Sequence, residues 1–205
     1  MPHPIHERLF PASRLVAIAA LAVMAVSMLA TRYHHFSSAL HLADTSWAVF
    51  FLAGLWFRQV RVLGGLLALA VVIDLGSVWL DGAAMASCFS PAYPGVLVAY
   101  AVLWGAGRLA GARLASGSNG LTMAMAWVVG ALITGSAAAF LVSNVTFYAF
   151  SGQFGDMPAV EYATRTLPYL AGYLSSAAIY SAMALAAMAL VNTLREGAGE
   201  RPDLS

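Results

Sequence analysis

The sequence contains no lysine, a single cysteine and little charge of either sign. Only 9% of its 205 residues are charged, whereas a soluble domain has about 25%. The ten basic residues are all arginine, and the formal net charge of +1 gives no reason to expect a nucleic-acid partner. With 61% hydrophobic residues and a mean hydropathy of +0.79, the chain has too few polar residues to cover a water-exposed surface.

The sequence also lacks the motifs of several enzyme classes. It contains no glycine-rich nucleotide-binding loop, no HExxH zinc motif and no constellation typical of a serine hydrolase. A lone cysteine cannot form an internal disulfide or a dithiol redox pair. We therefore expect that the chain does not hydrolyse ATP itself and is not an ordinary enzyme.

Long apolar segments fill most of the chain and predict an all-α integral membrane protein. Backbone polar groups in lipid must be satisfied internally, and the segments lack the alternation of a transmembrane strand, so helices are expected. At about 20 residues for each span, six spanning helices fit into a single membrane domain, residues 1–205. The expected helices are about 14–30, 45–58, 62–80, 94–108, 121–150 and 168–194, with a short outer surface helix at about 157–166.

The arginines predict how these helices are oriented. The first apolar segment follows Arg8 and Arg14, but it is long for a signal peptide and no convincing cleavage site follows, so we interpret it as the first spanning helix. With the N-terminus inside, eight arginines fall in the cytoplasm, and only Arg32 and Arg165 fall outside. This asymmetry predicts an even number of spans, with the N-terminus and the C-terminus both cytoplasmic.

Cys88 is a candidate metal ligand in the loop between the third and fourth expected helices. A thiolate is a soft donor, but a bare zinc or copper ion needs three or four protein ligands, and His34, His35 and His41 match no standard zinc spacing. A metal already held by a macrocycle needs only one axial ligand from the protein. The residues leave two alternatives open: such a ligand, or a free cysteine that fills space.

Asp74 is the one carboxylate well inside an expected span, roughly 18 Å along the third helix. An intramembrane acid is costly and suggests a function, so Asp74 either contacts a ligand or orients another helix. The two outer arginines, Arg32 and Arg165, either bind an anionic group such as a phosphate or pair with a nearby carboxylate. Aromatic side chains near the outer boundary form either an interfacial belt or a stacking surface; they include Tyr33, Phe36, Phe89 and Tyr93.

Several of these segments resemble the BtuM family of small bacterial cobalamin transporters, which are similar to the S-components of energy-coupling-factor (ECF) transporters. The resemblance covers about residues 10–195. It is carried by Thr31-Arg32-Tyr33-His34-His35-Phe36-Ser37-Ser38, residues 44–54, Asp81-Gly82 and Ser87-Cys88-Phe89-Ser90-Pro91-Ala92-Tyr93-Pro94. It implies a six-helix S-component-like bundle in the bacterial inner membrane, with a cobalamin pocket that opens to the periplasm.

The resemblance also implies a site and an activity. Cys88 corresponds to the family's cysteine and would be the axial cobalt ligand, so no free metal is expected. We expect uptake of cobalamin (vitamin B12), with loss of cyanide from bound cyanocobalamin as an accessory reaction. The remaining expected site residues are Tyr33, His34, His35, Phe36, Asp74, Phe89, Tyr93 and Arg165.

The expected partners are therefore the corrinoid and the lipid bilayer. The first helix lacks the Ala-x-x-x-Ala pattern with which S-components dock on an energising module, so a stable ATPase partner is not expected. Two other functions remain as alternatives: a haem- or quinone-binding electron carrier, and a non-transporting scaffold subunit.

Overall fold

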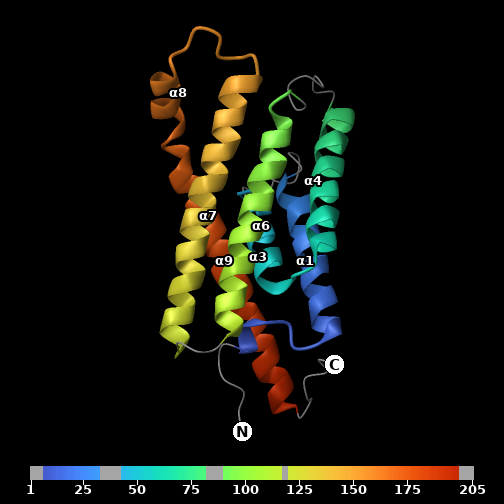
Figure 1. Ribbon diagram of the computed structural model, residues 1–205. Helices are drawn as coiled ribbons and strands as arrows, with labels where there is room; N and C mark the ends of the chain where they lie inside the picture. The colour runs from blue at the N-terminus through green and yellow to red at the C-terminus, as the bar shows by residue number, and fades with distance from the viewer. Residues whose placement is uncertain (1–6, 33–42, 82–89, 117–119, 199–205) are drawn as a thin grey trace.

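The computed structural model is a bundle of long helices, and it describes residues 7–32, 43–81, 90–116 and 120–198 (Figure 1). Those residues contain helices and connecting turns and no strand. The elements are the short 3₁₀ helix η1 (Glu7–Leu9) and the α-helices α1 (Arg14–Arg32), α3 (Ser46–Trp56), α4 (Val60–Asp81), α6 (Tyr93–Ala115), α7 (Gly120–Phe150), α8 (Ala159–Thr166) and α9 (Tyr169–Gly197).

Five of the described helices are long and apolar enough to cross a membrane, namely α1, α4, α6, α7 and α9. The expectation of a helical, multi-pass membrane protein is confirmed to that extent. The expected second span is shorter than the sequence predicts. Helix α3 has 11 residues, about 16 Å, because the backbone becomes extended at Phe57. The described residues therefore contain five candidate spans rather than six.

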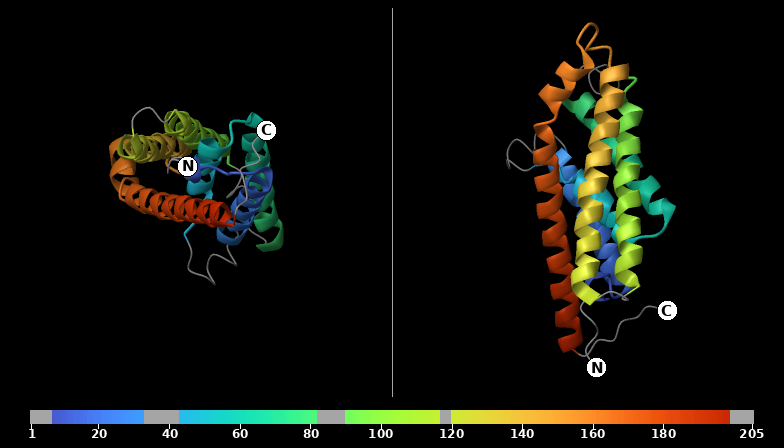
Figure 2. Two further views of the ribbon diagram at one scale, coloured as in Figure 1. Left: turned by 90° about the horizontal axis from the view of Figure 1, so that it is seen from below. Right: turned by 60° about the vertical axis from the view of Figure 1, so that its left-hand side comes forward.

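Helix α3 lies in the middle of the bundle (Figure 2). Every residue from Ser46 to Leu55 is buried, so the helix is enclosed by protein and has little contact with the surroundings of the bundle. It packs closely against α6 through glycines on both helices. A Cβ atom at Gly54 would overlap the backbone carbonyl of Trp104, and one at Gly107 would overlap that of Phe51. Glycine is thus required where these two backbones meet.

Helix α6 is longer than the sequence predicts, since it continues to Ala115 rather than ending near residue 108. Arg108 and Arg113 do not interrupt it. Their guanidinium groups lie over the rings of Trp104 and Trp127, at 5.2 and 4.9 Å from the ring centroids. Long arginine side chains can pack along an apolar surface while the charge stays near water, so a basic residue is a poor marker of a helix end.

The first and last described segments of the chain meet at one end of the bundle (Figure 1). Arg8 forms an ion pair with Glu196 (Nη2 to Oε2, 2.8 Å), and the Asn192 amide donates to the carbonyl oxygens of Arg8 (2.8 Å) and Phe10 (2.7 Å). We call this end the basic end, because η1, the start of α1, the turn between α3 and α4 with the start of α4, and the C-terminal parts of α6 and α9 lie toward it. These segments contain most of the arginines, namely Arg8, Arg14, Arg58, Arg61, Arg108, Arg113 and Arg195. Arg32 and Arg165 lie toward the opposite end.

Candidate functional site

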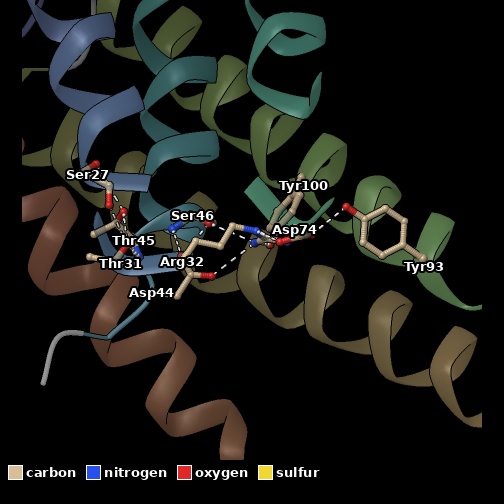
Figure 3. Close-up of polar contacts among 9 residues, drawn as sticks. All are labelled: Ser27, Thr31, Arg32, Asp44, Thr45, Ser46, Asp74, Tyr93 and Tyr100. Atoms are coloured by element: carbon tan, nitrogen blue, oxygen red, sulfur yellow. Dashed lines mark hydrogen bonds and ion pairs between the residues drawn. The ribbon is translucent and has the colours of Figure 1, made fainter. Parts of the chain in front are cut away.

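Arg32 and Asp74 form a two-pronged ion pair that joins α1 to α4 (Figure 3). The Nε and Nη2 atoms of Arg32 donate to Oδ1 and Oδ2 of Asp74, at 2.6 and 2.7 Å. The two side chains are only 12% and 17% exposed. Bidentate pairs of this kind fix orientation and are among the stronger polar contacts in proteins. The contact of Asp74 with Arg32 therefore orients α4 against the end of α1.

The same two residues extend the contact to other helices. Arg32 also donates through Nη1 to the hydroxyl of Tyr100 and to Ser46 Oγ (3.3 Å), and it lies 3.5 Å from Asp44 Oδ2. Tyr93 donates its hydroxyl to Asp74 Oδ2 at 2.8 Å. We call this set the polar network; its members are Arg32, Asp44, Ser46, Asp74, Tyr93 and Tyr100 (Figure 3). It joins α1, α3, α4 and α6.

A group of hydroxyls fixes the start of α3 to the end of α1, next to the polar network (Figure 3). Thr31 Oγ1 and Thr45 Oγ1 lie 3.0 Å apart, the Thr45 amide donates to Thr31 Oγ1 (3.0 Å), and Thr45 Oγ1 donates to Ser27 Oγ (3.3 Å). Asp44 accepts from the Ser46 amide (2.8 Å) and hydroxyl (2.6 Å) at the first turn of α3. The chain on either side of residues 33–42 is therefore held together by buried hydrogen bonds.

A cavity of about 260 Å³ lies beside Tyr93; its lining residues are Ser90, Ala92, Tyr93, Val96, Ser143, Asn144, Phe147 and Tyr173. We call it the candidate cavity. Tyr173 is stacked on Trp47 with ring centroids 4.7 Å apart, which fixes one aromatic wall. Aromatic rings combined with a few hydroxyl and amide groups are typical of small-molecule sites.

Asn144 connects the candidate cavity to α8. Its Nδ2 donates to the Phe140 carbonyl (2.9 Å), and its Oδ1 accepts from the Tyr162 hydroxyl (3.0 Å). Tyr162 is buried and packs against Tyr148 and Phe154, with ring centroids 5.0 and 4.7 Å away. Burial raises the pKa of the Tyr162 hydroxyl above its ordinary value near 10. The amide of Asn144 is held in a single orientation.

Two of the site residues expected from the sequence are brought into contact, since Tyr93 donates directly to Asp74. Arg165 does not take part in this contact. It lies on α8 in an ion pair with Glu161 (2.6 Å), and the two side chains are 64% and 45% exposed. The other expected residues lie outside the described part of the chain: Tyr33, His34, His35, Phe36, Cys88 and Phe89. Within the described ranges, no three His, Cys, Asp or Glu side chains come close enough to hold a metal ion.

The sequence did not identify Arg32 as the main partner of Asp74, or Tyr100 as a member of the network. Of the two alternatives for Arg32, the structure shows the pairing with carboxylates: Arg32 lies 3.5 Å from the nearby Asp44, but its contacts with Asp74 are shorter. One signal was available, because two opposite charges inside apolar segments reduce their cost by meeting. No protein-family model and no curated protein matches the chain, so the resemblance given above stays a prediction.

Proposed function

We propose that this protein takes up cobalamin across a bacterial inner membrane, and that it binds the corrinoid at the end of the bundle opposite the basic end. In this proposal the basic end is cytoplasmic, the polar network is on the periplasmic side, and α3 completes an even number of chain crossings. The arginine asymmetry supports this orientation, and the five apolar helices support a multi-pass membrane protein.

One observation carries the proposal. The stretches that resemble the transporter family are residues 31–38, 44–54, 81–82 and 87–94, and four of their described residues belong to the polar network: Arg32, Asp44, Ser46 and Tyr93. Arg32 immediately precedes residues 33–42 and Asp44 follows them, whereas Tyr93 lies four residues after 82–89. Asp74 bonds both Arg32 and Tyr93. The described residues next to 33–42 and next to 82–89 are thus connected through a single carboxylate.

The candidate cavity has groups that suit a corrinoid, which carries a flat macrocycle and several amide side chains. Tyr93, Phe147 and Tyr173 offer aromatic rings, and Ser90 and Ser143 offer hydroxyls. Its volume of about 260 Å³ is much smaller than a corrinoid. The proposal therefore assigns only one edge of the ligand to this cavity, and assigns the rest to residues 33–42 and 82–89.

Cys88 supplies the axial cobalt ligand in this proposal. The thiol would lose its proton, and the thiolate would replace the nucleotide base on one axial face of Co(III). Cyanide would then leave the opposite face with the electron pair of the Co–C bond, take up a proton and be replaced by water. The cobalt oxidation state does not change, so this ligand exchange needs no reductant.

Visible spectroscopy tests the ligand assignment. Purified protein is mixed with cyanocobalamin, and its corrin bands are compared with those of Cys88→Ser and of Ser87→Ala, a matched control from the same loop. We expect the bands to shift with the wild type and Ser87→Ala and to stay unchanged with Cys88→Ser. A wild-type spectrum identical to that of Cys88→Ser rejects both cobalt ligation and cyanide loss.

A growth assay tests transport separately. The gene is expressed in a cobalamin-dependent bacterial strain that lacks its own importer, and growth is measured at low cobalamin concentration. Rescue supports uptake. Failure to rescue, with the protein present in the membrane, favours the scaffold alternative, and a haem absorbance in the purified protein would favour the electron carrier.

A further inference from the structure

A second cavity lies on the outside of the bundle, on α6 between the polar network and the basic end. Its volume is about 530 Å³, and we call it the arginine groove; its lining residues are Arg58, Gly105, Arg108, Leu109 and Ala112. Arg58 comes from the turn between α3 and α4, and the other four residues lie along one face of α6. The groove therefore has two guanidinium groups beside a strip of small and apolar side chains.

No described carboxylate lies within ion-pair distance of either arginine of the groove, as is also the case for Arg14, Arg61 and Arg113. By contrast, Arg8, Arg32 and Arg165 all form ion pairs. Arg108 lies over the ring of Trp104, which leaves its charge without an anionic partner. Arg58 and Arg108 are both exposed. Two guanidinium groups on one groove form a site for an anion, and the fork geometry of arginine suits a phosphate.

The depth of the groove points to a lipid. Helix α6 has 23 residues, about 34 Å, and Arg108 is seven residues, or roughly 10 Å, from its end at Ala115. The hydrocarbon core of a bilayer is about 30 Å thick. With α6 centred in the bilayer, its end at Ala115 lies about 2 Å beyond the core and the Cα atom of Arg108 roughly 8 Å inside it, from where a long arginine side chain can extend toward the phospholipid phosphates.

The wall of the groove also fits an acyl chain. Nothing lies within 4 Å of the position that a Cβ atom would take on Gly105, and Ala112 has only a methyl group. Leu109 is 72% exposed and presents an apolar surface next to Arg108. An acyl chain can lie along this strip while its phosphate contacts the arginines. Basic pockets between helices on the cytoplasmic side are known to bind anionic headgroups.

We propose that the arginine groove binds an anionic phospholipid, with its phosphate between Arg58 and Arg108 and an acyl chain along Leu109 and Ala112. This lipid site is independent of the proposed transport function. It explains how two unpaired charges are accommodated at this depth, since the lipid supplies the counter-charge that the described residues do not.

Lipid titration tests the proposal. The full-length protein in detergent micelles receives increasing dioleoylphosphatidylglycerol or dioleoylphosphatidylcholine, and bound lipid is counted by native mass spectrometry while the unfolding temperature is followed. We expect the wild type to retain phosphatidylglycerol preferentially and to be stabilised by it. Loss of two charge contacts in Arg58→Gln/Arg108→Gln should weaken that binding roughly 30-fold.

Two controls make the result decisive. Arg61→Gln removes an exposed arginine in the first turn of α4 that does not line the groove, and it should bind phosphatidylglycerol as the wild type does. Arg58→Gln alone leaves the contact of Arg108 with Trp104 intact, so it should weaken binding even if the double variant is poorly folded. Equal binding by the wild type and Arg58→Gln overturns the proposal. So does equal binding of the two lipids, or full competition by millimolar inorganic phosphate, which would identify a site for the free ion.

Discussion

Removing either partner of the ion pair between Arg32 and Asp74 should strongly destabilise this bundle. Breaking a buried pair costs about 3–5 kcal/mol, because the remaining charge is left uncompensated. The side chains are 12% and 17% exposed, so we expect the lower value, about 3 kcal/mol, for Arg32→Met or Asp74→Asn. At roughly 2–4 °C for each kcal/mol in a chain of this size, the unfolding temperature should fall by roughly 6–12 °C.

The stability of the double variant shows whether the two side chains stabilise the bundle through each other. Once one partner is gone, the second has no counter-charge to lose, so Arg32→Met/Asp74→Asn should be about as stable as either single variant. We expect a coupling free energy of about 2–3 kcal/mol in a double-mutant cycle, measured by thermal unfolding in detergent micelles with circular dichroism.

A matched control is available at the surface. The exposed pair of Arg165 and Glu161 is separated by four residues on α8, and such pairs contribute about 0.3–0.5 kcal/mol. Arg165→Met should therefore lower the unfolding temperature by no more than about 2 °C. If the losses from Arg32→Met and Asp74→Asn simply add, or are as small as that of Arg165→Met, the network does not stabilise the bundle as argued.

Two further variants test the packing and the wall of the candidate cavity. Gly107→Ala should destabilise the protein by about 1–3 kcal/mol or more, because the new methyl group overlaps a backbone carbonyl of α3 that cannot rotate away. Gly64→Ala is the control, since nothing lies within 4 Å of the added atom, and it should have no such effect. Equal unfolding temperatures of the two variants would contradict the close contact. Tyr162→Phe removes the hydrogen bond to Asn144 and should cost about 1 kcal/mol in the same assay, whereas an unchanged unfolding temperature would show that this bond does not hold the amide.

The apolar segments predicted the long helices well, since a run of about 20 apolar residues has few alternatives to a spanning helix. The same reasoning extended α3 too far. A helix that is apolar on all sides is expected both in lipid and in the centre of a protein, and composition does not separate these cases. Helix α3 is apolar because it is surrounded by other helices.

The arrangement of the site was less predictable. Asp74 was recognised from its cost in a membrane, but its partner Arg32 is 42 residues away, and only the folded bundle brings them together. The close contact of α3 with α6 had a signal, because Gly107 and Gly111 are spaced as small residues are in tight helix pairs. That signal was missed because the expected helix ended at about residue 108. Cys88 and the histidines lie outside the described residues, so their roles stay predictions.

The glycines between α3 and α6 also limit how the molecule can change shape. Where side chains separate two helices, rotamer changes let one helix slide past the other. Here the backbone of Gly107 rests on the carbonyl of Phe51, and that of Gly54 on the carbonyl of Trp104, so no side chain can yield. We therefore expect α3 and α6 to move together, and an opening that admits or releases a bound molecule to occur where side chains separate the helices.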